Sequence, residues 1–171
     1  MKAFAHLIKT LDSTNKTNEK VAALTAYFNQ APEDDKLWTI AILSHRRPKR
    51  PVNTTLLRQW ATEISGIPAW LFEESYHIVG DLAETIALII PNERTQTTNK
   101  SLSEFIGEII TLRTLSEDKK KEYLQENWRN LSYFERFVFN KIITGGFRIG
   151  VSQKLMTRAL SKATGIDEDI L

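Results

Sequence analysis

The chain has 171 residues and a formal net charge of +2, a length that suits one domain able to bury about two-thirds of the surface of its unfolded form. It has no cysteine, and its three histidines (His6, His45 and His77) are widely spaced, which excludes a disulfide framework and argues against structural zinc. The N-terminal apolar run is too short for a signal peptide and the longest apolar stretch, 86–90, is far below the roughly 20 residues that cross a bilayer, so we expect a soluble cytoplasmic protein without a membrane partner.

Helix signals dominate along the chain and strand signals are nearly absent, so we predict an all-α fold. Apolar residues at helical spacing predict helices over about 2–12, 17–30, 32–44, 53–65, 68–89, 116–129 and 152–164. Two further helices should begin at the capping boxes Ser101-Leu-Ser-Glu104 and Ser132-Tyr-Phe-Glu135, in which the serine accepts from an orphan amide and the glutamate reaches back. The four tryptophans fall at helical apolar positions, so we place them in the core.

Two segments of the chain resemble each other at an offset of 99 residues, 52–72 and 151–171. The identical pairs are Val52 and Val151, Leu56 and Leu155, Gly66 and Gly165, and Ile67 and Ile166. We therefore expect an internal repeat with two pseudo-symmetric halves, about 1–91 and about 101–171, joined by a polar hinge at about 92–100 within a single domain over 1–171. A long apolar helix follows the first copy, whereas the second stops at Leu171, so we expect the second half to be truncated there.

The basic residues are segregated along the chain. Residues 36–62 carry six basic side chains and no acid, and so do residues 136–166. The rest of the chain carries 11 basic and all 21 acidic residues, a balance of about −10. Two positive windows in an acidic body create a directed field that attracts polyanions.

Each basic window contains a loop that leads into a helix N-terminus. Unpaired amides and the positive end of the helix dipole make such a terminus a natural phosphate site, and glycines let the main chain approach a ligand closely. Two loops related by a pseudo-two-fold would suit the two phosphate strands of a duplex, so we expect binding through phosphates and groove shape rather than bases. The candidate DNA-binding residues are Arg46, Arg47, Lys49, Arg50 and Asn53 in the first loop, and Gly146, Arg148, Gly150, Ser152 and Lys154 in the second.

The sequence lacks the common catalytic motifs. Lys-x-Asp-Gly, Gly-x-x-x-x-Gly-Lys-Ser/Thr, His-Glu-x-x-His and Gly-x-Ser-x-Gly are all missing, so we expect no catalytic centre and no metal site. Asp81 and Glu84 lie one helical turn apart and could join a metal site, but a capping or repeat-packing role is favoured. The string His45-Arg-Arg-Pro-Lys-Arg-Pro51 also resembles a nuclear localisation signal.

Three segments, 1–24, 79–88 and 145–166, resemble the N-terminal DNA-binding domain of bacterial-type ATP-dependent DNA ligases. The most specific piece is Arg148-Ile-Gly-Val-Ser152, which matches the family's Leu-Arg-Ile-Gly-Val-Ser pattern, with Phe147 in place of the leucine. The resemblance implies an all-helical domain of two pseudo-symmetric halves that binds the minor groove around a nick in double-stranded DNA and helps the catalytic domains close around it.

The same resemblance assigns the chemistry to other parts of a parent enzyme. Its adenylation and OB domains, with ATP and Mg2+, would seal nicks in DNA replication, repair and recombination, and the adenylated lysine would lie in a Lys-x-Asp-Gly motif beyond this domain. An internal two-fold removes the need for a dimer, so we expect a monomer. Two alternatives remain, a stand-alone helical DNA-binding protein and a helical interaction module that binds acidic partners.

Overall fold

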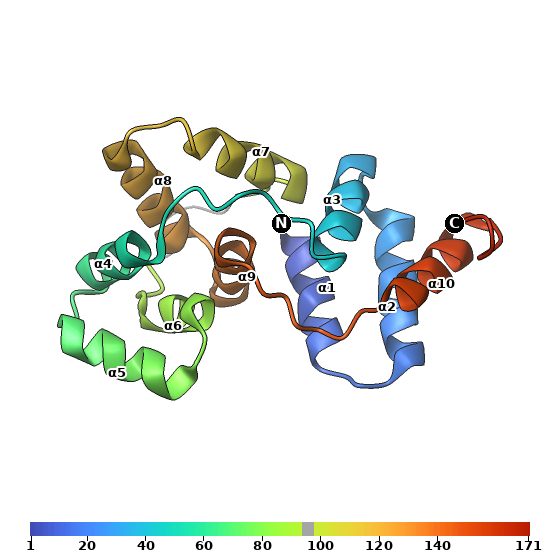
Figure 1. Ribbon diagram of the computed structural model, residues 1–171, viewed down its shortest axis with the longest axis horizontal. Helices are drawn as coiled ribbons and strands as arrows, with labels where there is room; N and C mark the ends of the chain where they lie inside the picture. Colours follow the sequence, from blue (N-terminus) through green and yellow to red (C-terminus); the bar gives the residue numbers. More distant parts are fainter. Residues whose placement is uncertain (94–97) are drawn as a thin grey trace. The chain divides into compact units, whose positions relative to one another are not determined.

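The computed structural model describes residues 1–93 and 98–171, which form ten α-helices and no strand (Figure 1). The helices are α1 (Lys2–Asp12), α2 (Thr17–Gln30), α3 (Glu33–Leu43), α4 (Thr54–Ser65), α5 (Ala69–Val79), α6 (Leu82–Ile89), α7 (Leu102–Leu112), α8 (Glu117–Asn130), α9 (Tyr133–Thr144) and α10 (Gln153–Thr164). The predicted all-α class is confirmed. Residues 94–97 of the predicted hinge lie outside the described residues. None of the described helices is long and apolar enough to cross a membrane.

The single helix predicted over 68–89 was wrong, because the segment forms α5 and α6. Gly80 ends α5 in the left-handed region, with a φ of 75°. Asp81 then begins α6, and its carboxylate accepts a hydrogen bond from the amide of Glu84 at 2.9 Å. A left-handed glycine typically ends a helix, and an N-cap aspartate typically begins one. The apolar periodicity continues on both sides of this pair, and for that reason it predicted a single helix.

Tertiary contacts divide the chain into two units. Unit 1 consists of residues 1–47, 101–103 and 146–171 and contains α1, α2, α3 and α10. Unit 2 consists of residues 48–100 and 104–145 and contains the other helices, with nearly all of α7. Each unit therefore draws helices from both sides of the predicted hinge.

In unit 1, α2 packs against both α1 and α10 (Figure 1). The ring of Phe4 in α1 meets the rings of Tyr27 and Phe147 edge to face, with centroids 6.5 and 6.1 Å apart. Thr39 of α3 donates its hydroxyl to the Tyr27 hydroxyl at 2.9 Å, which joins α3 to α2. Burial raises the pKa of Tyr27 to about 12, so this hydroxyl stays protonated at neutral pH.

In unit 2, α9 is the central helix and packs closely against α6. Its polar side chains satisfy buried backbone and indole groups. Arg136, only 1% exposed, donates to the carbonyls of Ala87 at 3.0 Å and Ile90 at 2.8 Å near the end of α6. Asn140 accepts from the Trp128 indole at 2.7 Å and donates to the Ala83 carbonyl at 3.1 Å. These contacts use polar groups that α9 could not otherwise bury without a large cost.

Four helices recur along the chain at nearly constant spacing. α7, α8 and α9 each begin 100 residues after α1, α2 and α3, and α10 begins 99 residues after α4. In α1 the side chains of Phe4, Ile8 and Leu11 are buried, and in α7 those of Phe105, Ile109 and Leu112 are buried at an offset of 101. In unit 1, α10 packs against α2, and in unit 2, α4 packs against α8. The fourth helix of each series thus packs on the second helix of the other.

Helix starts were predicted well, and one helix also receives a cap from a distant segment. At α9 the Ser132 hydroxyl accepts from the amide of Glu135, as the capping box predicts. At α7 the amides of Leu102 and Ser103 donate to the carboxylate of Asp35 in α3, at 3.1 and 2.8 Å. A carboxylate at a helix N-terminus is favourable whether it comes from the same segment or a distant one.

The tryptophans were predicted correctly only in part. Trp60 and Trp128 are fully buried in unit 2. Trp38 is half-buried, and Trp70 is 66% exposed, so its placement in the core was wrong. α5 buries only Phe72, which leaves Trp70 on its solvent side.

Candidate nucleic-acid interface

The two predicted basic loops connect the two units. Loop 1 (residues 44–53) joins α3 to α4, and loop 2 (residues 145–152) joins α9 to α10. The chain passes from unit 1 to unit 2 within loop 1, after Arg47, and enters the C-terminal part of unit 1 within loop 2, at Gly146. Each loop therefore has one end anchored in each unit.

Loop 2 alternates buried and exposed residues. Phe147 and Ile149 are buried, and Phe147 packs against the ring of Phe4. Arg148 and Gly150 are exposed between and after them. The apolar pair attaches the loop to unit 1, and the residues that sequence analysis predicted to contact DNA face solvent.

The start of α10 continues this exposed surface. The Ser152 hydroxyl accepts from the amide of Leu155 at 3.2 Å and so caps the helix, as predicted. Lys154 is exposed in the first turn. The free amides and the dipole of the helix add to the charges of Lys154 and Arg148, and this combination favours an anion. All five residues predicted for loop 2 and the start of α10 are exposed, namely Gly146, Arg148, Gly150, Ser152 and Lys154.

Loop 1 is built differently. His45 follows the C-cap of α3 and lies in the left-handed region, with a φ of 62°. Pro51 and Val52 are buried, and the Asn53 side chain caps α4 by accepting from the amide of Leu56 at 2.9 Å. Arg46, Lys49, Arg50 and Asn53 are exposed, and Arg47 is half-buried. Loop 1 therefore presents its charges on long side chains.

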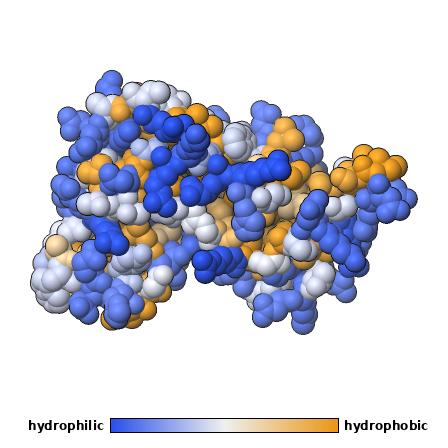
Figure 2. Space-filling model, in the orientation of Figure 1, coloured by the Kyte–Doolittle hydropathy of each residue, from blue (hydrophilic) through white to orange (hydrophobic). Residues whose placement is uncertain are grey.

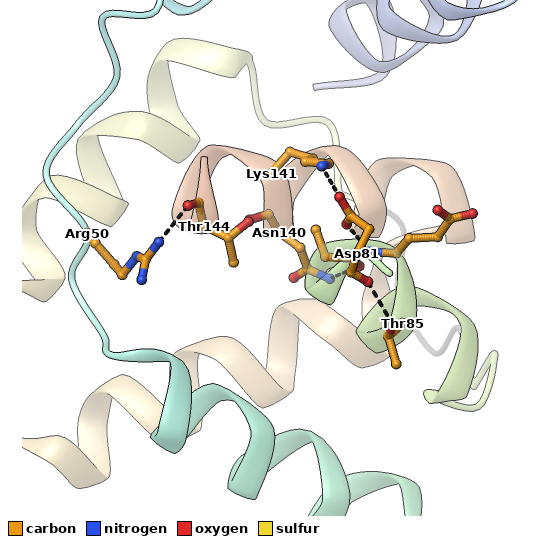
Figure 3. Close-up of polar contacts among 8 residues, drawn as sticks. Arg50, Asp81, Thr85, Asn140, Lys141 and Thr144 are labelled. Carbon is orange, nitrogen blue, oxygen red and sulfur yellow. Dashed lines mark hydrogen bonds and ion pairs between the residues drawn. The ribbon is translucent and has the colours of Figure 1, made fainter. Parts of the chain in front are cut away.

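Arg50 already has a structural contact. Its guanidinium donates to the carbonyl of Thr144, the last residue of α9, at 2.7 Å (Figure 3). A cation at the C-terminus of a helix satisfies an orphan carbonyl and complements the dipole. The guanidinium has five donors, so this bond leaves others for a ligand.

Unit 2 sequesters two cations of the second basic window. Arg136 is buried against carbonyls, and Lys141 pairs with Asp81 (Figure 3). Asp81 thus serves as a helix cap and an ion-pair partner, which confirms the capping role favoured for it. In the described residues no group of three or more His, Cys, Asp or Glu side chains could hold a metal ion.

Two residues near loop 2 were missed by sequence reasoning. Lys20 of α2 donates its ammonium group to the Ile149 carbonyl at 2.5 Å. His45 lines a cavity of about 340 Å³ beside the loop. The other residues of this cavity are Leu43, Phe147, Ile149, Gly150, Val151 and Ser152. No local pattern marks Lys20, because its partner lies 129 residues away.

Comparison with known families gives the same family that the Arg148–Ser152 pattern of loop 2 resembles. The sequence model of the DNA ligase N terminus matches residues 1–161. The chain belongs to this family. It is a DNA ligase N-terminal domain of the ATP-dependent type, and the match includes both loops of the domain. No curated protein matches the sequence of this ligase domain.

Proposed function

We propose that this ligase domain binds duplex DNA, nicked or intact, without sequence specificity, as the DNA-binding domain of an ATP-dependent DNA ligase. The observation that carries the proposal is loop 2, where buried Phe147 and Ile149 leave Arg148 and Gly150 exposed at the start of α10. Phosphates fit such a surface, since it combines main-chain donors, a helix dipole and cationic side chains. Contacts of this kind recognise the backbone and groove shape rather than the bases.

Each loop would hold its own stretch of phosphates. The proposed contacts of loop 1 are Arg46, Arg47, Lys49, Arg50 and Asn53, and those of loop 2 with the start of α10 are Gly146, Arg148, Gly150, Ser152 and Lys154. Arg50 would contact DNA with donors that its bond to Thr144 leaves available. Binding around the minor groove of a nick would place one loop on each strand.

The recurrence of helices supports a two-fold character for this grip. α4 and α10 both have 12 residues, begin at a side-chain N-cap and end at a left-handed glycine. Each is preceded by one of the two loops. We therefore propose that residues 1–91 and 101–171 are pseudo-symmetric halves of one domain, joined at about 92–100, and that a monomer suffices for binding.

Strand joining itself would belong to the adenylation and OB domains of the parent enzyme. These domains would use ATP and Mg2+ to seal nicks in DNA during replication, repair and recombination, and the parent enzyme would be cytoplasmic. The residues of this chain do not fit those cofactors, since the chain has no Lys-x-Asp-Gly motif and its described part has no metal-binding cluster. We assign no step of the reaction to it.

Fluorescence anisotropy with nicked and intact duplexes over a salt series tests the proposal. The logarithm of the binding constant should fall steeply with the logarithm of salt, and Arg148→Ala should reduce that slope by about 0.9, the share of one phosphate. Arg113→Ala is the matched control, because Arg113 is exposed outside both loops. An unchanged slope for Arg148→Ala would remove loop 2 from the interface. Tight binding to an acidic peptide with weak binding to DNA would favour the interaction module.

A further inference from the structure

A buried lysine lies behind loop 2. Lys20 of α2 is only 7% exposed, and its ammonium group donates to the carbonyls of Ile149 at 2.5 Å and Gly150 at 3.4 Å. No carboxylate of the described residues forms an ion pair with it. Burying an ammonium group is costly unless hydrogen bonds compensate. The two carbonyls therefore stabilise the buried charge of Lys20, and Lys20 in turn orients the carbonyls.

The orientation of these carbonyls decides where the loop's donors point. In a trans peptide the N–H and C=O groups point in opposite directions, and the described part of the chain contains no cis peptide bond. Because the carbonyls of Ile149 and Gly150 point at Lys20, the N–H groups of Gly150 and Val151 point away from it. Arg148 is exposed immediately before them.

We propose that Lys20 is a positioning residue for DNA binding, which holds the Ile149 and Gly150 peptides so that Arg148 and the adjacent main-chain donors face a phosphate. Lys20 itself does not touch the DNA. Its charge, buried directly behind the loop, also adds to the attraction for an anion. The inference rests on the proposed function of loop 2.

The apolar anchors of the loop cannot substitute for Lys20. Burial of Phe147 and Ile149 holds the loop against unit 1, but the hydrophobic effect is not directional. A hydrogen bond has a preferred angle as well as a distance and therefore fixes the rotation of a peptide. Removal of the ammonium group should leave the loop attached and its donors misaligned.

A double-mutant cycle on the intact chain separates positioning from direct contact. Lys20→Met should weaken binding to nicked duplex about tenfold, and Arg148→Ala should cost little more in that background, since coupled groups are not additive. The control is Lys16→Met, which removes an exposed charge that pairs with Glu19 near the start of the same helix. Its effect should add to that of Arg148→Ala.

A second readout follows the loop without DNA. In Lys20→Met the ¹H–¹⁵N NMR signals of Gly150 and Val151 should shift or broaden, while the melting temperature shows that the fold persists. If the methionine variant does not fold, Lys20→Gln, which keeps a neutral donor, enters the same cycle.

The outcomes separate the two proposals. If the wild-type chain binds DNA and Lys20→Met binds equally well, or its effect adds fully to that of Arg148→Ala, the positioning role is wrong and the DNA-binding function stands. If the wild-type chain does not bind DNA even at low salt, the proposed function is itself wrong.

Discussion

Loop 1 and loop 2 make the same connection between the units with different chemistry. Loop 1 is rich in proline and arginine, whereas loop 2 contains Gly145, Gly146 and Gly150, all with positive φ. Loop 1 is held by buried Pro51 and Val52, and loop 2 by an aromatic ring, Ile149 and Lys20. Two loops can therefore suit the same ligand by presenting either charged side chains or main-chain donors.

This difference predicts unequal sensitivity. Charge on flexible side chains acts at a distance and tolerates small displacements, but salt screens it. Main-chain donors act only at hydrogen-bond distance and depend on the loop conformation. Substitutions in loop 2 should therefore affect folding and binding together, and those in loop 1 should affect mainly the electrostatic part of binding.

Phe147→Ala should have the largest effect. It removes a buried ring that packs on Phe4, and we expect a loss of about 3–5 kcal/mol in urea denaturation. Val52→Ala in loop 1, also buried, removes two methylene equivalents and should cost about 2 kcal/mol. Equal losses would mean that the two loops are anchored alike.

Gly150→Ala should be destabilising by about 1–2 kcal/mol, since φ is +60° at Gly150 and side chains rarely adopt that conformation. The added Cβ would also lie 3.1 Å from the Lys20 ammonium nitrogen and would displace it. His45→Gly in loop 1 makes the reverse change at a φ of 62° and should stabilise by about 0.5–1 kcal/mol. Thermal unfolding of both variants checks the pair, and a stable Gly150→Ala variant would contradict the strain.

The two N-caps provide a matched pair. Asn53→Ala and Ser152→Ala each remove one side-chain acceptor from a helix N-terminus and should each cost about 1 kcal/mol. Gln153→Ala, at an exposed neighbouring position that does not cap the helix, should change stability by less than about 0.5 kcal/mol. Chemical denaturation distinguishes these values. A much larger cost at one cap would show that the loops differ there as well.

Removal of exposed charge from loop 1 should leave stability unchanged. Arg46→Ala combined with Lys49→Ala should shift the free energy of unfolding by less than about 0.5 kcal/mol. The salt slope for duplex DNA should nevertheless fall by about 1.8, for two phosphates. Anisotropy over a salt series measures this slope, and a slope equal to that of the wild-type chain would exclude these side chains from binding.

Short-range signals explain why the helix boundaries could be predicted. Asn53 and Gly66 delimit α4 through bonds to residues three or four positions away. Ser152 and Gly165 do the same for α10. The Gly80-Asp81 pair carried the same kind of signal and was overlooked within an apolar pattern. These features depend on a few adjacent residues, so the sequence contains them in full.

The sequence predicts how many charged residues a segment contains, but not how many of them are exposed at the surface. The second basic window contains six cations, but Arg136 is buried against carbonyls and Lys141 is paired with Asp81. Three apolar side chains, Ile166, Ile170 and Leu171, are exposed near the end of unit 1, where Figure 2 shows apolar surface. Which side of a helix is covered depends on the helix that packs against it.

The sequence by itself determined the all-α fold class, most helix boundaries and the N-caps of the two helices that follow the loops. It also contains the pattern at Arg148 that resembles the ligase family. Only the tertiary structure decided which cations reach solvent, that Asp35 caps α7 from another helix, and that Lys20 fixes the peptides of loop 2. The physical reason is the sequence separation over which the interactions act. Helices form through hydrogen bonds over four residues, whereas burial and long-range capping depend on which distant segments pack together.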